Sequence, residues 1–367
     1  MKYLIDTITY DTYRNIKSGI YVGNYKAPKN VNLTELENFI DNNKENILIH
    51  SATLFELYVR CIKNTDIQRQ YKDNNQINLG QFADDYRFIR NVNHFSILNE
   101  MPYYFDCETI VNHYNKGIKF DPKSYIEEKI EMEVQKISWY FSLITSICEH
   151  KSFDVYGDTV DLNLHGRYHA LRTLFLEINL KKILRNYYYA DERKEISVKN
   201  MDILLGYYLK MSIFCIKNKY LLLNSENRAE EAVRLLGEYG KLWTQSQLGN
   251  TSGVSYISNI LKDKNDILSY LSSSVVKGIF KEISDKLSNV EKEYYLYLLK
   301  KTLLNKYKIT KNDFTDFLIT SAADYRDSNI LSDEIRVITY DKKVKKFIEE
   351  KGYYYDSYLY SKLYVEY

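Results

Sequence analysis

Short apolar runs alternate with amphipathic segments over residues 1–62. The apolar runs cover residues 2–5 and 47–49, and their length and branched side chains predict buried strands. Residues 32–42 place apolar side chains at helical spacing, with Asn32 or Thr34 as the N-cap. The segment after the second run also has helical spacing. This order of strands and helices predicts an α/β unit.

The hydrophobic pattern changes over residues 63–305. Apolar positions there recur mainly with a period of 3.6 residues, which is typical of helices that pack through one face. The clearest segments are 125–148, 168–185, 200–218, 226–243 and 290–306. We therefore expect a mostly α-helical insertion domain over 63–305.

Residues 306–367 again contain predicted helices and a predicted strand in alternation, as the N-terminal end does. Thr310 and Asp313 have the spacing of a capping box, which predicts a helix that begins there and continues to Ala323. Residues 334–340 predict a strand, and 342–351 predict a short helix. We expect residues 1–62 and 306–367 to form one α/β domain, with a parallel sheet flanked by helices, that the insertion splits in the sequence.

The composition is that of an ordinary globular protein. Of the 367 residues, 45% are hydrophobic and 27% are charged, and the formal net charge is +2. These values exclude a fully disordered chain and a membrane bundle, and any nucleic-acid surface must be a local patch. With no apolar run long enough for a membrane helix and no signal-peptide pattern, we expect a cytoplasmic location without membrane contact.

The cysteines are spaced too far apart to indicate a zinc site, and we expect them to be reduced thiols. They are Cys61, Cys107, Cys148 and Cys215.

Acidic residues stand near the predicted strand ends and helix starts. Asp6 and Asp341 each follow a strand directly, Glu56 lies on the helix after the second strand, and Asp316 lies on the helix that begins at Thr310. Ligand sites of open α/β sheets form at the carboxyl ends of the strands. Clustered carboxylates repel one another unless a cation offsets their charge, and oxygen ligands suit Mg²⁺ or Mn²⁺. The alternative is that these acids are helix caps and solvated groups, since the chain carries 49 acidic residues.

Four sequence segments resemble the successive motifs of PIN-domain nucleases. They occur in the family's order at Leu4–Thr7, Ser51–Leu57, Asp316–Ala323 and Val337–Asp341. The resemblance covers the two ends of the chain and implies a PIN-like fold. It also implies a metal-dependent nuclease that cuts RNA, with relatives that act on structured DNA.

The resemblance also implies roles for individual residues. Asp6, Glu56, Asp316 and Asp341 become the catalytic and metal-ligating set for Mg²⁺ or Mn²⁺, Thr339 supplies a supporting hydroxyl, and Thr7 and Ser51 are weaker supports.

The chain departs from the family pattern in two places. The interval between Asp316 and Asp341 is longer than usual, and one of Asp324, Asp327 and Asp333 could replace Asp341. The insertion separates Glu56 from Asp316, so the site closes only if the two ends fold together. Asp313 competes with Asp316 as a ligand, although the capping box accounts for it structurally.

One basic segment of the insertion contains interleaved tyrosines, and such segments bind phosphates and stack bases. Its basic residues are Arg167, Arg172, Lys181, Lys182 and Arg185. The alternative interpretation is the solvated basic face of an amphipathic helix.

The leading hypothesis is a metal-dependent endoribonuclease that cleaves single-stranded or structured RNA, with the insertion selecting substrate or regulating access through a protein partner. The alternatives are a catalytically degenerate interaction module for nucleic acid or protein, and a structure-specific DNA nuclease.

Overall fold

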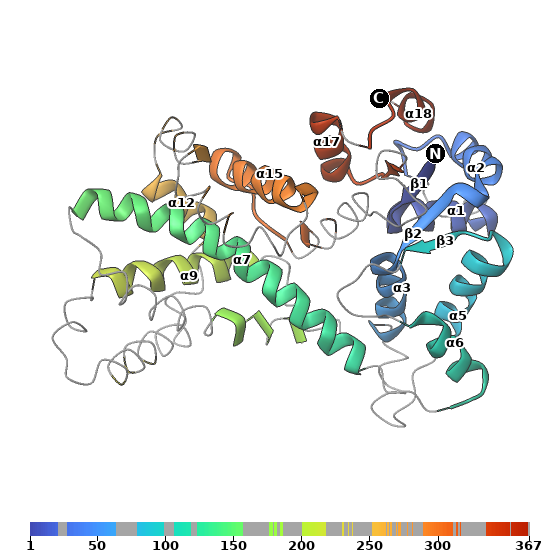
Figure 1. Cartoon of the computed structure of the whole chain (residues 1–367), viewed down its shortest axis with the longest axis horizontal. Coiled ribbons are helices and arrows are strands. Elements are labelled where there is room, and N and C mark those ends of the chain that lie inside the picture. The colour runs from blue at the N-terminus through green and yellow to red at the C-terminus, as the bar shows by residue number, and fades with distance from the viewer. Residues whose placement is uncertain are drawn as a thin grey trace.

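The computed structural model describes residues 1–20, 28–63, 79–98, 106–118, 123–156, 200–217, 252–261, 289–310, 335–352 and 354–365, together with isolated positions between these ranges. The described residues form a sheet of parallel strands in the order β3–β2–β1–β4 (Figure 1). The strands are β1 (Lys2–Ile5), β2 (Ile47–His50), β3 (Ser96–Leu98) and β4 (Ile335–Ile338).

The two ends of the chain meet in this sheet. Strand β1 pairs with β4, and Leu4 lies opposite Val337. On its other side β1 pairs with β2, where Leu4 lies opposite Leu48. All three side chains are buried, as expected for parallel strands covered on both faces. The prediction that the ends fold together is therefore confirmed.

Helices follow the strands at the ends of the chain. They are α1 (Thr7–Lys17), α2 (Leu33–Asn42), α3 (Ser51–Lys63), α17 (Lys342–Lys351) and α18 (Ser357–Leu363), with a 3₁₀ turn at Lys44–Asn46. Asn32 caps α2 as predicted, since its side chain accepts a hydrogen bond from the backbone N–H of Glu35. Helix α17 covers the predicted range and ends at Lys351; Gly352 caps it, with a φ of 65°, the left-handed conformation that glycine adopts without strain. Helix α1 lies in a segment that the sequence analysis did not assign to a helix.

The predicted boundary at residue 62 is wrong. Strand β3 lies within 63–305, but it pairs with β2 and so belongs to the sheet. In the sequence, helix α5 (Gly80–Arg87) precedes β3 and helix α6 (Cys107–Asn115) follows it. A π-helical turn at Phe88–Val92 lies between α5 and β3. Helix α5 packs on α3. The pattern missed β3 because three residues at a sheet edge are too few to show a period.

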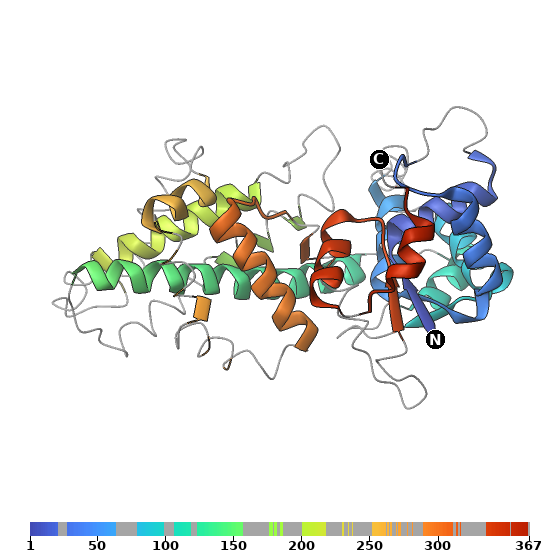
Figure 2. The same ribbon diagram turned by 90° about the horizontal axis from the view of Figure 1, so that it is seen from above.

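The rest of the insertion is helical where it is described. Its helices are α7 (Lys123–Tyr156), α9 (Asn200–Lys217), α12 (Gly253–Ile260) and α15 (Asn289–Asn305). They form an elongated part beside the sheet, along which α7 extends (Figures 1 and 2). The predicted helices at 125–148, 200–218 and 290–306 are confirmed within one or two residues at the described ends, apart from the longer α7. The segments 168–185 and 226–243 lie mostly outside the described residues.

Aromatic contacts join the helical part to the sheet part. The rings of Tyr294 and Tyr297 on α15 lie 5.1 and 5.3 Å from the ring of Phe347 on α17. Tyr140 on α7 lies 5.8 Å from Phe314, which belongs to the segment that also carries Asp316. Aromatic pairs of this kind add to the apolar burial. The insertion therefore packs against the elements that carry two of the predicted site acids.

Gly253 marks the close contact of α12 with α9. A Cβ atom there would lie 2.8 Å from the backbone oxygen of Asp202 and 2.9 Å from the backbone nitrogen of Gly206. We expect Gly253→Ala to lower the free energy of unfolding by about 1–3 kcal/mol, because the two helices must separate. Urea denaturation measures this change. Gly237→Ala is the control, since nothing lies within 4 Å of its added methyl group; equal effects of the two variants would contradict the prediction.

No helix of the described residues is long and apolar enough to cross a membrane. Cys61, Cys107 and Cys148 are buried.

Candidate functional site

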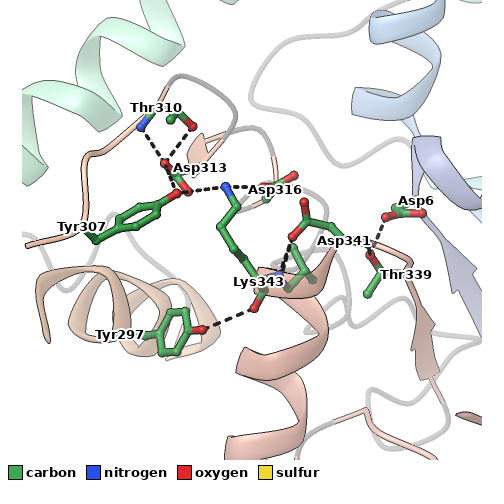
Figure 3. A network of polar contacts seen from close by, with 10 residues as sticks. Asp6, Tyr297, Tyr307, Thr310, Asp313, Asp316, Thr339, Asp341 and Lys343 are labelled. Atoms are coloured by element: carbon green, nitrogen blue, oxygen red, sulfur yellow. Dashed lines mark hydrogen bonds and ion pairs between the residues drawn. The ribbon is translucent and has the colours of Figure 1, made fainter. Parts of the chain in front are cut away.

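The site lies at the carboxyl edge of the sheet. Asp6 follows β1, Ser51 follows β2 and Thr339 follows β4. Because these strands are parallel neighbours, the residues that follow them lie along one edge. Figure 3 shows Asp6 and Thr339 beside Asp341, Asp316 and Lys343.

Asp6 is buried at this edge and caps α1. Its side chain is 6% exposed and accepts a hydrogen bond of 2.8 Å from the backbone N–H of Thr9. The other oxygen accepts a hydrogen bond from the Thr339 hydroxyl. Burial raises the pKa of Asp6 to about 6; the bonds from Thr339 and Thr9 oppose the rise, and the charge of Asp341 adds to it. Asp6 and Asp341 therefore lie within electrostatic reach of each other.

Thr339 connects two of the predicted acids. It is fully buried, and its hydroxyl donates to Asp6 and accepts a hydrogen bond of 3.0 Å from the backbone N–H of Asp341. The supporting role predicted for this hydroxyl agrees with these contacts.

Two tyrosines of the C-terminal segment form hydrogen bonds with the backbone of Thr339. The Tyr360 hydroxyl accepts from the backbone N–H of Thr339 at 3.1 Å and donates to the carbonyl of Val337 at 2.9 Å. The Tyr364 hydroxyl donates to the Thr339 carbonyl. Neither tyrosine can be predicted from the sequence, because a tyrosine-rich chain gives no local signal that distinguishes them.

We expect Thr339→Val to lower the free energy of unfolding by about 1–3 kcal/mol, because it leaves buried polar partners at Asp6 and Asp341 without their hydrogen bonds. Thermal denaturation at neutral pH measures the loss. Thr339→Ser keeps the hydroxyl and serves as the control; a serine variant as unstable as the valine variant would show that the methyl group matters more than the hydroxyl.

Asp341 caps the next helix of the site. Its Oδ1 atom accepts hydrogen bonds from the backbone N–H groups of Lys343 at 2.7 Å and Val344 at 3.1 Å. The residue is partly exposed. The cap fixes this carboxylate at the N-terminus of α17, three residues after Ile338, where β4 ends.

Glu56 reaches the site from α3. The Thr7 hydroxyl, in the first turn of α1, donates a hydrogen bond to its Oε2 atom. The charge of Glu56 also contributes to the raised pKa of Asp316, so these carboxylates are within electrostatic reach across a large separation in sequence. The supporting role that the resemblance gives Thr7 is compatible with this bond.

Asp313 is engaged by protein donors. It is fully buried and accepts from the Thr310 backbone N–H at 2.6 Å, which is one of the two hydrogen bonds of the predicted capping box. The hydroxyls of Thr310 and Tyr307 donate to it at 2.9 and 2.8 Å. The Lys343 ammonium adds a bond of 2.8 Å. These bonds take up both carboxylate oxygens and explain Asp313 as a structural residue.

Asp316 lies nearer the other acids. Burial raises its pKa well above the usual range, and the charges of Asp341, Asp313 and Glu56 raise it further. The Lys343 ammonium opposes this rise, and its Nζ atom lies 3.8 Å from Asp316 Oδ2. The predicted four acids thus belong to one electrostatic group that also contains a lysine.

This group fits a divalent cation in chemistry but is not closed around one. Its donors are carboxylate oxygens, which Mg²⁺ and Mn²⁺ prefer. The hydroxyl of Ser51, at the same sheet edge, is buried and has no hydrogen-bond partner in the described part of the chain. Among the described residues, however, no three acidic, histidine or cysteine side chains lie close enough together to hold a metal ion.

Other predicted residues lie apart from this group. Lys181 forms an ion pair with Glu131 at 2.6 Å, and Arg185 forms one with Glu127 at 2.7 Å. Intrachain acids therefore partly neutralise the predicted basic surface. The remaining candidates, Arg167, Arg172, Lys182, Asp324, Asp327 and Asp333, lie outside the described residues.

Lys343 is a further residue of this group that was not predicted from the sequence. Its signal was its place two residues after Asp341, inside the first turn of a predicted helix. Four lysines stand between positions 342 and 346, and sequence alone does not distinguish the one that faces the acids.

Comparison with protein-family models gives no match, and no similar protein is found among curated proteins or solved structures.

Proposed function

We propose that this chain is a metal-dependent endoribonuclease of the PIN-like type. The observation that carries the proposal is the electrostatic group formed by Asp6, Asp341, Asp316 and Glu56 at the carboxyl edge of a parallel sheet. Carboxylates gathered from distant parts of a chain raise one another's pKa, and this arrangement costs stability unless a cation binds there.

The protein's own residues prepare the site for a Mg²⁺ or Mn²⁺ ion. Asp6 and Asp341 would hold the ion, with Asp316 and Glu56 completing the set. The bound ion would lower the pKa of water and offset the charge that develops on a phosphate. Thr339 orients Asp6 through a hydrogen bond. Asp6 and Asp341 are the N-cap residues of α1 and α17, and these bonds hold both carboxylates at the edge of the sheet. Thr7 holds Glu56 in the same way.

The choice of RNA follows from the PIN resemblance of the four motifs. The helical insertion packs on α17 and on the segment that carries Phe314 and Asp316, so a substrate or partner bound to the insertion would lie next to the site. This placement supports a role of the insertion in substrate selection or access.

The test is cleavage of labelled single-stranded RNA and tRNA with Mn²⁺ or Mg²⁺. We expect internal cuts that EDTA stops and that Asp6→Asn and Asp316→Asn abolish. Asp84→Asn is the matched control, because Asp84 is exposed and pairs with Arg87 on α5. Cleavage that survives both EDTA and Asp6→Asn would contradict the proposal.

Other substrates distinguish the alternatives. Metal-dependent cutting of flap DNA in preference to RNA would replace the proposal by a structure-specific DNA nuclease. RNA binding without turnover, unchanged by Asp6→Asn, would replace it by a degenerate binding module.

A further inference from the structure

Both the backbone and the side chain of Lys343 form hydrogen bonds with neighbouring residues. Its backbone N–H donates to Asp341 at 2.7 Å, and its carbonyl accepts a hydrogen bond of 3.4 Å from the Tyr297 hydroxyl. Its ammonium donates to Asp313 at 2.8 Å, and Asp313 is itself held by Tyr307 and Thr310. The side chain is 27% exposed. The position of this cation is therefore set by the fold.

The Lys343 ammonium lies among the site acids. Figure 3 places Nζ between Asp313 and Asp316, with Asp341 beside Asp316. The distance from Nζ to Asp316 Oδ2 is 3.8 Å, and the lysine charge acts against the raised pKa of that carboxyl. The part of the acid group around Asp316 thus already has a positive charge built into the chain.

Phosphodiesterases with two metal ions place both within about 4 Å of each other, between shared carboxylates. In this chain a second ion beside Asp316 would meet the Lys343 ammonium at close range, and like charges repel strongly where water is scarce. At the other end of the group, Asp6 accepts hydrogen bonds from uncharged donors, the backbone N–H of Thr9 and the Thr339 hydroxyl.

We propose that Lys343 occupies the place of a second cation, so that the site takes one divalent ion, at the end formed by Asp6 and Asp341. This inference rests on the proposed function. It predicts that removing the lysine charge opens a second site at Asp316.

The experiment counts bound Mn²⁺ by electron paramagnetic resonance, without RNA, in the full chain. We expect one ion for wild type and two for Lys343→Gln, which removes the positive charge and keeps a polar side chain. Lys343→Arg keeps the charge and should bind one. Lys346→Met is the control, because Lys346 lies on the same helix but is exposed and pairs with Glu350.

A second variant keeps the inference testable if Lys343→Gln does not fold. If Lys343→Gln unfolds because Asp313 stays buried without its cation, Asp313→Asn combined with Lys343→Gln removes both charges and should also bind two ions. Two ions in wild type, or one in every folded glutamine variant, would overturn the inference and leave the proposed function intact. No bound Mn²⁺ in wild type would instead contradict the proposed function, and the inference with it.

Discussion

Replacing Asp6 by asparagine is expected to stabilise the protein at neutral pH and to abolish its RNA cleavage. Burial raises the pKa of Asp6 to about 6 in the folded chain, from a usual value of 3.8. Between these two values the folded state binds more protons than the unfolded state, so stability falls as pH rises and stays lower above pH 6. Asparagine carries no charge to bury and still caps α1 through Thr9.

The expected gain is up to about 3 kcal/mol at pH 7.5, and it should nearly vanish at pH 4. Thermal denaturation at both pH values, without added metal, measures it. The same variant should lose at least about 100-fold in cleavage rate, because the divalent ion loses a carboxylate ligand. Asp84→Asn should change neither quantity.

A variant that is less stable than wild type at pH 7.5 would show that ionised Asp6 is stabilised by its surroundings. Retained cleavage by a folded variant would remove Asp6 from the catalytic set.

Breaking the ion pair between Lys136 and Glu291 is expected to cause a large loss of stability. The pair joins α7 to α15 at 2.6 Å, and its side chains are only 10% and 11% exposed. Lys136→Met would leave the Glu291 carboxylate buried without its cation, at a cost of about 3–5 kcal/mol. Urea denaturation followed by circular dichroism measures the loss.

Two further variants test the reason for this loss. Lys136→Met combined with Glu291→Met removes both charges and should recover most of the stability, because apolar side chains replace buried ion pairs at little cost. Lys181→Met breaks an ion pair of the same 2.6 Å length that is solvent-exposed, and should cost less than about 1 kcal/mol. Equal losses from the two single variants would contradict the role of burial.

The local pattern of apolar and polar residues predicts most of the sheet and the main helices. The strands at Lys2–Ile5 and Ile47–His50 are apolar runs that end at polar residues, and α17 follows the amphipathic period from 342 to 351. The capping box at Thr310 is likewise a property of four consecutive residues. Local interactions decide such features, and the sequence therefore predicts them.

Strand β3 and helix α1 show the limit of this approach. Three residues at a sheet edge have no measurable period, and α1 is rich in threonine and tyrosine, which have no strong helix preference. Packing against the sheet decides both elements, with Tyr10 and Tyr13 of α1 fully buried.

The sequence by itself determined which acids stand at strand ends and helix starts, because these positions follow from chain order and local periodicity. Only the tertiary structure decided how these acids are paired: Asp6 with Thr339, Glu56 with Thr7, and Asp313 with Lys343. These contacts join residues from separate elements, and the Asp6–Thr339 bond spans almost the whole chain. Their geometry depends on how the elements pack, which no local pattern records.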